Sequence, residues 1–280
     1  MTDFDVVTGA FSYSGAAIAK ELQATGRRVR TLTGHPGRAF AGSGIEVRPL
    51  DFADPAALAE SLRGAGTLYN TYWVRFAHGN VDHPVAVARS RVLFQVAVAA
   101  GVRRIVHVSI TNPSADSPYP YFRGKAAVEQ ALRDLGVSHA VLRPAILFGG
   151  DGEYRIRPIH VDDLARLAVR AGNSALTEVI DAVGPERPTF LALVQAIKAA
   201  VGSRSQVVRV PGTLIPAAGR LLGLVLRDTL LTAEEYRAMA DGLADTDGPA
   251  TGEIALSQWI ADHKDTLGRV YANELTRHFR

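Results

Sequence analysis

The sequence predicts an α/β fold, a doubly wound parallel sheet of Rossmann type with a small, mainly helical C-terminal lobe. Short apolar runs alternate with helical patterns through the first half of the chain, joined by turns that contain glycine. A glycine turn also follows the first apolar run directly and opens the first helical pattern. The last part of the chain reads as helices without strand alternation. We therefore expect a main domain over residues 1–150, and sheet completion plus a smaller lobe over residues 151–280.

The expected elements follow one another in strand–helix order. Gly26 and Gly101 stand where the first and third helices should end, as glycine often does just past a helix C-terminus. Asp54-Pro55 starts the second helix, because aspartate caps a helix and proline suits its first position. The expected strands are 4–7, 28–32, 45–50, 67–70, 104–109, 137–142 and 178–181, and the expected helices are 15–25, 54–63, 84–100, 123–135, 161–171 and 189–201.

The glycine turn runs from Thr8 to Gly15 and has the spacing Gly-x-x-Gly-x-x-Gly, with Ser12 in place of the middle glycine. A tight turn of this kind presents free backbone N–H groups at a helix N-terminus, where they bind a pyrophosphate. A loop without a ligand is the alternative interpretation. The position of the turn between a strand and a helix favours a bound dinucleotide. The expected contacts are Gly9, Phe11, Ser12, Tyr13, Ser14 and Gly15.

The end of the second strand favours NADP over NAD as the cofactor. NAD-binding proteins usually place an acid there, about 20 residues beyond the glycine turn, and this stretch contains none. Thr33, His35 and Arg38 instead suit a 2′-phosphate, because a hydroxyl and a guanidinium both donate hydrogen bonds. Arg38 as an ordinary surface charge is the alternative. Asp51 and Phe52, after the third strand, suit the edge and face of an adenine, although Asp51 equally suits a turn cap.

Tyr121 and Lys125 are four residues apart, so they lie on one face of the helix that follows the fifth strand. A nearby ammonium lowers the pKa of a phenol, which makes the pair a usable proton donor or acceptor. A hydroxyl at the end of that strand would hold a substrate oxygen beside Tyr121. Ser109 and Thr111 are the candidates, with Thr111 slightly favoured, and the capping of the following turn is the alternative role for both.

Aromatic and histidine side chains follow the fourth strand. Tyr72, Trp73 and Phe76 either line an apolar pocket beside the site or belong to the core. His78 and His83 border the expected site, as substrate contacts or as part of a surface loop.

Together these residues resemble the short-chain dehydrogenase/reductase superfamily, in its extended and atypical branches of epimerases/dehydratases and NmrA-like proteins. The resemblance covers the glycine turn, Asp51, the Tyr121–Lys125 segment, Leu142-Arg143-Pro144 and the stretch from Arg157 to Leu164, and it extends to the segments that begin at Asn70 and His107. It implies NAD(P) across the strand edge, with Asn70 among the contacts. It also implies Tyr121 as acid–base, Lys125 as its partner on the ribose, and Ser109 or Thr111 as the hydroxyl. Relatives carry a further helical stretch near Gly150-Asp151. Either this stretch is deleted in the protein, which predicts a more open substrate pocket, or the present sequence omits it.

Two functions from different classes fit these observations. The first is an NAD(P)-dependent oxidoreductase or epimerase/dehydratase that acts on a carbonyl or alcohol small molecule with a Tyr-Lys acid–base pair. The second is a non-catalytic NAD(P)-binding sensor or assembly factor of NmrA-like type, which Ser12 in the glycine turn favours.

The composition, with 47% hydrophobic and 21% charged residues, is that of an ordinary globular protein. The net charge of +3 is spread without a basic block, so we expect no nucleic-acid partner. We expect no metal, because Asp162 and Asp163, near His160, fit the first turn of a helix. The chain has no cysteine, no signal-peptide pattern and no apolar stretch of membrane-spanning length. A cytoplasmic protein without a membrane partner is expected, and a homodimer is a possible assembly.

Overall fold

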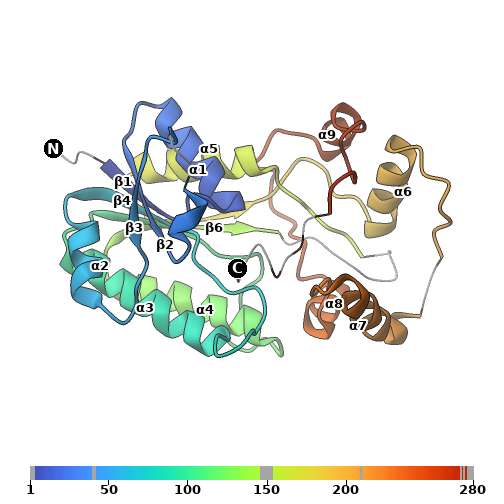
Figure 1. Cartoon of the computed structure of the whole chain (residues 1–280), viewed down its shortest axis with the longest axis horizontal. Coiled ribbons are helices and arrows are strands. Elements are labelled where there is room, and N and C mark those ends of the chain that lie inside the picture. The colour runs from blue at the N-terminus through green and yellow to red at the C-terminus, as the bar shows by residue number, and fades with distance from the viewer. Residues whose placement is uncertain are drawn as a thin grey trace. The chain divides into compact units, whose positions relative to one another are not determined.

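A computed structural model describes residues 4–39, 42–145, 154–208, 211–271, 273 and 275 (Figure 1). The chain divides into two compact units. Unit 1 comprises Met1–Arg143 and Val161–Ile180, and unit 2 comprises Pro144–His160 and Asp181–Arg280. The chain thus leaves unit 1 after the sixth strand and returns to it for one helix and most of one strand. The shortened connection near Gly150-Asp151 lies outside the described residues.

Unit 1 is built on a seven-stranded sheet with the order β3-β2-β1-β4-β5-β6-β7 (Figure 1). The pairs from β3 through to β6 are parallel. This doubly wound arrangement confirms the predicted fold class, and every expected strand is present. The strands are β1 (Phe4–Thr8), β2 (Val29–Thr33), β3 (Ile45–Pro49), β4 (Ala65–Asn70), β5 (Arg104–Val108), β6 (Ser138–Pro144) and β7 (Glu178–Ala182).

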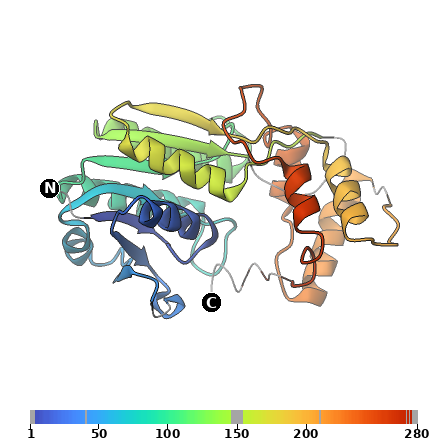
Figure 2. The same ribbon diagram turned by 90° about the horizontal axis from the view of Figure 1, so that it is seen from above.

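Helices cover both faces of the sheet, as parallel strands require (Figures 1 and 2). On one face, α1 (Tyr13–Ala24) packs against α5 (Val161–Asn173). On the other, α3 (His83–Ala99) packs between α2 (Pro55–Leu62) and α4 (Pro120–Asp134). Asp54 caps α2 as predicted, because its side chain accepts a hydrogen bond from the N–H of Ala57 at 3.0 Å.

The main core of unit 1 lies between the sheet and α2, α3 and α4. Alternate strand residues face it, and the helices contribute leucines and Phe94 at helical spacing. Burial of these apolar side chains drives the helices onto the sheet. The fully buried members include Val6, Leu68, Ile105, Leu58, Leu62, Leu93 and Leu132.

The carboxyl ends of β1 and β4 mark the point where the strand order reverses. β2 and β3 extend from β1 to one side, while β4, β5 and β6 extend to the other. The loops after β1 and β4 therefore diverge, and they leave a crevice in which open α/β sheets bind their ligands. The glycine turn and Asn70 both lie at this edge.

Unit 2 is mainly helical, in agreement with the predicted C-terminal lobe. Its helices are α6 (Phe190–Ala200), α7 (Ile215–Leu226), α8 (Ala233–Ala240) and α9 (Leu256–Asp262), with the short 3-10 turn η2 (Gly212–Leu214). A small core of Ile156, Leu193, Met239, Ala244 and Ile260 holds α6, α8 and α9 together.

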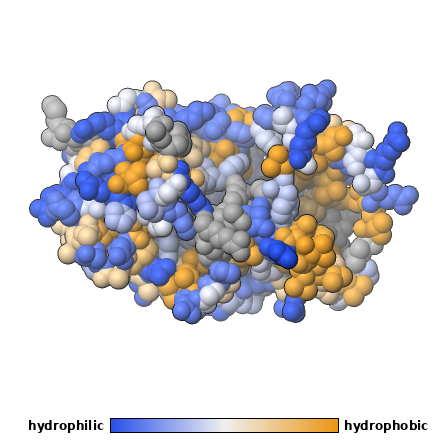
Figure 3. Space-filling model, in the orientation of Figure 1, coloured by the Kyte–Doolittle hydropathy of each residue, from blue (hydrophilic) through white to orange (hydrophobic). Residues whose placement is uncertain are grey.

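Helix α7 exposes much of its apolar side-chain surface. Leu221, Leu224 and Val225 are 67%, 77% and 73% exposed, and apolar side chains gather over the α7 and α8 part of the face in Figure 3. Among the described residues, no helix has the length and apolar character needed to cross a membrane.

Candidate functional site

The glycine turn joins β1 to α1 through a conformation that only glycine accommodates without strain. Gly9 has a φ of +65°, a region that favours glycine. A Cβ on Gly15 would lie 2.2 Å from the carbonyl oxygen of Gly9, so α1 approaches the turn more closely than any side chain at position 15 would allow. Both glycines therefore act as the sequence predicts, one in the turn and one in the close packing of helix and strand.

Ser12 occupies the N-cap position of α1, but its side chain does not cap the helix. Its Oγ donates a hydrogen bond to the carbonyl oxygen of Gly9 at 2.6 Å, and its N–H donates to the same oxygen at 2.8 Å. A hydroxyl has one proton to donate. The Ser12 hydroxyl therefore donates to a phosphate only after it rotates away from the Gly9 carbonyl oxygen. The first turn of a helix directs its backbone N–H groups out of the N-terminus, here at Tyr13, Ser14 and Gly15. They are the donors that suit a pyrophosphate.

Thr8 holds the two sides of the crevice together. Its Oγ1 accepts hydrogen bonds from the N–H groups of Thr71 at 2.7 Å and Tyr72 at 3.1 Å, and it donates to Oδ1 of Asn70 at 3.2 Å. The Thr71 hydroxyl donates in return to the carbonyl oxygen of Thr8 at 2.6 Å. The ends of β1 and β4 are therefore fixed before any ligand arrives.

Asn70, a predicted cofactor contact, is completely buried. Its Oδ1 accepts from Thr8 and from the N–H of Tyr72, and its Nδ2 lies 3.0 Å from Nδ1 of His107. Because the amide nitrogen is the donor in this pair, Nδ1 of His107 accepts and the ring proton sits on Nε2. In this structure the Asn70 side chain links β1, β4 and β5.

The residues expected around the cofactor adenosine lie at the ends of β2 and β3. The Thr33 hydroxyl oxygen accepts a hydrogen bond from the N–H of His35 at 3.0 Å, which leaves its proton available to donate. Arg38 ends a 3-10 turn that begins at Pro36, and its side chain is half-buried. These groups share one short loop, as a 2′-phosphate site would need.

The Asp51 side chain accepts from the N–H of Ala53 at 2.9 Å, so the turn cap weighed as its alternative role is present. The Phe52 ring packs against Tyr72 with ring centroids 5.0 Å apart, and the Arg89 guanidinium lies 5.3 Å from the Phe52 centroid. An aromatic face and a cation are thus available beside the loop after β3.

Lys125 is a strongly perturbed ionisable group near the predicted site. Its side chain is 2% exposed, and its Nζ donates to the carbonyl oxygen of Val108 at 3.0 Å. Burial lowers the pKa of Lys125 to about 7, against the opposing effect of the Glu129 carboxylate. A lysine at this pKa responds strongly to any new charge placed beside it.

Tyr121 lies one helical turn before Lys125 and contacts three other rings, including that of the neighbouring Phe122 at a centroid distance of 5.6 Å. Its ring meets Trp73 edge-on at a centroid distance of 5.7 Å, and His83 edge-on at 5.5 Å. The Nζ of Lys125 lies 4.4 Å from the Trp73 ring centroid. The structure therefore brings Tyr121 and Lys125 to a common aromatic neighbour.

The two candidate hydroxyls after β5 are both buried. Ser109 is 4% exposed and its Oγ has no hydrogen-bond partner among the described residues, whereas Thr111 is completely buried. His107, two residues before Ser109 on the same strand face, is also completely buried. Burial, with a smaller contribution from the Lys125 ammonium, lowers the pKa of His107 well below its usual value, so this ring is neutral.

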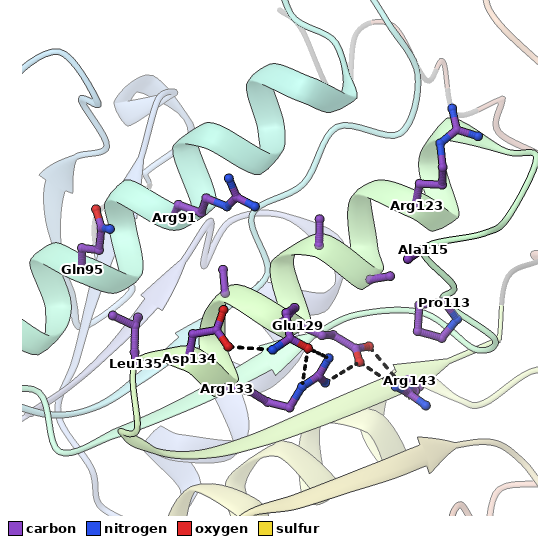
Figure 4. A pocket seen from close by; sticks show the side chains of 14 residues that line it. Arg91, Gln95, Pro113, Ala115, Arg123, Glu129, Arg133, Asp134, Leu135 and Arg143 are labelled. Atoms are coloured by element: carbon purple, nitrogen blue, oxygen red, sulfur yellow. Dashed lines mark hydrogen bonds and ion pairs between the residues drawn. The ribbon is translucent and has the colours of Figure 1, made fainter.

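A separate hollow of about 800 Å³ lies along the partly exposed side of α4 (Figure 4). Arg91 of α3 and Arg123, Arg133 and Arg143 give it a basic lining, which Glu129 and Asp134 partly neutralise. The predicted site residues do not line this hollow. Glu129, the carboxylate that acts on Lys125, is among the residues that line it.

The structure thus gathers most predicted residues at the carboxyl edge of the unit 1 sheet, around the β1–β4 crevice. Sequence reasoning missed Thr8, His107 and Glu129. Glu129 had an available signal, because it follows Lys125 at the i, i+4 spacing. The roles of Thr8 and His107 depend on partners more than 35 positions away, and no local pattern reports them.

Comparison with known proteins agrees with this geometry. Residues 9–171 match a family model described as NAD(P)H-binding. A sterol demethylase protein B of Methylococcus capsulatus is 31% identical over 170 residues, or 51% of each chain. A photosystem II assembly factor of Cyanidium caldarium is 22% identical over 242 residues, or 78% of each chain. The chain thus spans about half the length of the first of these relatives.

Two solved structures share the fold over almost the whole chain. Triphenylmethane reductase of Citrobacter sp. superposes with a TM-score of 0.78 at 18% identity, covering 93% of this chain and 99% of that one. An NADPH-dependent quinone oxidoreductase of Escherichia coli, solved with NADPH, superposes with a TM-score of 0.74 at 22% identity and covers 92% and 99%. At this identity the likeness concerns the fold.

Proposed function

The chain belongs to the NAD(P)H-binding family, and we propose that it is an NADP(H)-dependent oxidoreductase acting on a carbonyl or alcohol group of a small molecule. The observation that carries this proposal is Lys125. It is buried at the carboxyl edge of the sheet, one helical turn after Tyr121, with a pKa of about 7. A lysine in that state beside a phenol is the arrangement that makes tyrosine an acid–base near neutral pH.

When bound, the cofactor would supply a hydride to a substrate carbonyl carbon, or would accept one from an alcohol carbon. In the direction of reduction, Tyr121 donates its phenolic proton to the carbonyl oxygen as the C–H bond forms. The phenolate that remains is stabilised by the Lys125 ammonium, and it takes a proton back from solvent. The Ser109 hydroxyl, whose oxygen has no partner among the described residues, is available to hold the substrate oxygen, and Thr111 stays its alternative.

The preference for NADP over NAD belongs to the same proposal. Support comes from the loop after β2, where Thr33, His35 and Arg38 offer hydrogen-bond donors and no carboxylate. The proposed cofactor contacts also include the glycine turn, Asp51, Phe52, Asn70 and the Lys125 side chain. An epimerase/dehydratase reaction uses the same hydride and proton transfers and differs in returning the cofactor unchanged. We further propose a cytoplasmic location, with a homodimer as the assembly to test.

The first test is calorimetric titration of the purified protein with NADPH and with NADH, followed by a panel of carbonyl and quinone substrates. Tighter binding of NADPH and NADPH-dependent turnover that Tyr121→Phe abolishes, with cofactor binding retained, would support the proposal. Full activity in Tyr121→Phe would remove the tyrosine from the mechanism. Formation of product without any net consumption of NADPH would point to the epimerase/dehydratase reaction.

A second candidate function is a non-catalytic NAD(P)H-binding sensor or assembly factor. Its support is the assembly factor among the curated relatives, which matches 78% of this chain, together with the Ser12 hydroxyl bonded to Gly9 within the phosphate turn. A tight NADPH complex that transfers no hydride to any member of the substrate panel would favour this candidate.

A further inference from the structure

Three aromatic rings from different elements meet around the proposed catalytic pair. Trp73 follows β4, His83 begins α3, and Tyr121 lies in the first turn of α4. The Trp73 and His83 rings are parallel to within 6°, with centroids 6.1 Å apart. The Tyr121 ring stands perpendicular to both, at 82° to Trp73 and 87° to His83. Edge-to-face contacts at these distances are favourable, so both neighbours hold the Tyr121 ring in one orientation.

Gly124 explains how the Trp73 ring reaches this position. A Cβ at Gly124 would lie 3.0 Å from Cη2 and 3.3 Å from Cζ2 of Trp73. Because Gly124 has no side chain, the indole packs directly against this part of the α4 surface. Gly124 stands between Tyr121 and Lys125 in the sequence. The backbone of Gly124 is in the α-helix and needs no special conformation. Its role is therefore to make room for the indole.

The face of the same indole serves Lys125. The ammonium nitrogen lies 4.4 Å from the Trp73 ring centroid, and tryptophan is the aromatic side chain that attracts a cation most strongly. This contact, the carbonyl oxygen of Val108 and the Glu129 carboxylate stabilise the charged form of a side chain removed from water.

Trp73 carries a cost that a purely structural aromatic residue would avoid. Its Nε1 is buried and has no hydrogen-bond partner among the described residues. A buried donor without a partner destabilises the folded state, and phenylalanine would fill part of this space without that donor. The position therefore uses a property particular to indole, namely its extended face towards a cation.

We propose that Trp73 and His83 act as an aromatic clamp that positions the two proposed catalytic residues, fixing the ring plane of Tyr121 and holding the ammonium of Lys125 on the indole face. This inference rests on the proposed function for its catalytic consequence, while the clamp itself is a property of unit 1 alone. The two clamp residues are positioning residues, since they act through Tyr121 and Lys125. Loss of the clamp should slow proton transfer more than it weakens cofactor binding.

The kinetic test compares Trp73→Leu, Trp73→Phe and His83→Ala with a matched control. The control is Trp259→Phe in unit 2, because Trp259 also packs against histidine rings, at centroid distances of 4.5 Å from His263 and 6.2 Å from His160. We expect Trp73→Leu to lower kcat about tenfold to a hundredfold, the range that misplacement of a reacting group produces. The KM for NADPH should stay nearly constant, and the pH profile of kcat should shift. Trp73→Phe should recover part of the loss, and Trp259→Phe should have the parent kcat.

A second measurement needs no turnover. The chain contains two tryptophans, so the emission of the Trp259→Phe protein comes from Trp73 alone. The titratable groups near this ring are Lys125, His83 and Tyr121. Glu129 acts on Lys125, which in turn acts on His107. We expect a pH-dependent emission change between pH 6 and roughly pH 8 that persists in His83→Phe and disappears in Lys125→Met.

The possible outcomes distinguish failure of the aromatic-clamp proposal from failure of the proposed enzymatic function. A kcat loss confined to the clamp variants, together with an emission change that depends on Lys125, supports the clamp. Trp73 emission that does not respond to Lys125→Met, or Trp73→Leu with parent kcat and pH profile, overturns it. NADPH added to the Trp259→Phe protein should quench Trp73 by energy transfer. If it does not bind while the Lys125-dependent emission change is present, the proposed function fails and the clamp geometry stands.

Discussion

Arg143 of β6 makes two hydrogen bonds to the buried Glu129 of α4, from Nε to Oε1 at 3.0 Å and from Nη2 to Oε2 at 2.6 Å. Arg133 adds a longer ion pair from Nη1 to Oε2 at 3.5 Å. Glu129 is 1% exposed and lies one helical turn beyond Lys125. Its carboxylate thus links the proposed catalytic lysine to Arg133 of α4 and Arg143 of β6. Figure 4 shows both arginines beside Glu129, and this arrangement leads to the first prediction.

Replacing Glu129 by glutamine should lower the pKa of Lys125 further. The carboxylate is the group that raises this pKa against the effect of burial, so its neutralisation leaves burial unopposed. Glutamine keeps an acceptor for Arg143, and the stability loss should be about 1–3 kcal/mol. The ¹⁵N or ¹³C NMR titration of the Lys125 side chain measures the pKa directly. Asp134→Asn, at an exposed acid of the same helix, is the control, and an equal shift in both variants would contradict the prediction.

Replacing Lys125 by methionine should stabilise the protein at acidic pH. The pKa of Lys125 is about 7 in the folded state against 10.5 for the free side chain, so between these values the unfolded chain binds more protons and stability rises with pH. Below pH 7 both states are protonated and the cost of burying the charge is fully present. We expect Lys125→Met to raise the free energy of unfolding by about 3 kcal/mol at pH 6, with the difference shrinking towards pH 10. Urea unfolding at several pH values measures it, and a pH-independent difference would argue against a buried ammonium.

Gly15→Ala should damage both the fold and cofactor binding. The new methyl group would lie 2.2 Å from the carbonyl oxygen of Gly9, so either the turn or α1 must move. We expect a loss of at least about 2 kcal/mol in stability and weaker NADPH binding. Gly219→Ala is the matched control, because the new Cβ would lie no closer than 3.5 Å to its nearest neighbour, the carbonyl oxygen of Leu231. Alanine is also more favourable than glycine in a helix interior, by up to about 1 kcal/mol. Thermal unfolding and calorimetry distinguish the two variants, and equal stability in both would show that the turn yields easily.

Arg38→Ala should reduce the affinity for NADPH without changing that for NADH. The guanidinium is proposed to meet the 2′-phosphate, and a charge-assisted hydrogen bond of this kind is worth about 1.5–3 kcal/mol, or roughly a tenfold to hundredfold change in Kd. Arg63→Ala, which removes an exposed arginine paired with Glu60, controls for the general loss of positive charge. Calorimetric Kd values for both cofactors decide the matter, and a parallel loss for NADH and NADPH would assign Arg38 no role in choosing between them.

Thr8→Val should loosen the crevice between β1 and β4. The substitution keeps the shape of the side chain and removes the oxygen that accepts from the N–H groups of Thr71 and Tyr72. The Thr71 N–H then loses its partner, while the Tyr72 N–H keeps its hydrogen bond to Oδ1 of Asn70. The loss should cost about 1–3 kcal/mol. Thr8→Ser restores the oxygen and should recover most of the stability. Hydrogen exchange at the Thr71 amide gives a local readout, and protection that survives in Thr8→Val would contradict the role of this hydroxyl.

Local patterns were sufficient for the sheet, the helices and the edge where the site lies. Alternating apolar runs fix which strand faces are buried, and the glycine turn marks the first strand–helix junction. The boundary of α4 illustrates the limit: a start at residue 123 was expected, whereas the helix begins at Pro120. Proline at the first helical position explains the earlier start. Tyr121 therefore lies inside α4, one helical turn before Lys125.

The surroundings of the proposed catalytic pair could not be read from the sequence. Trp73 was assigned either to a pocket or to the core, because its contact with Gly124 joins positions 51 apart, and only the packing of α4 brings them together. The sequence leaves two roles open for His83, a substrate contact or part of a surface loop, and it does not predict that His83 stacks on Trp73. The sheet edge follows from topology, but the identity of each neighbour depends on side-chain packing across elements.

The indole-sized space above Gly124 also constrains how this sequence is able to vary. A larger residue at position 124 collides with Trp73, and a smaller one at position 73 leaves a void against α4. The two positions are therefore coupled, and we expect substitutions at one to be accepted chiefly when the other changes in compensation. For protein engineering, they form a single adjustable pair: exchanging bulk between them would remodel the surroundings of Tyr121 and Lys125 while the total volume stays the same.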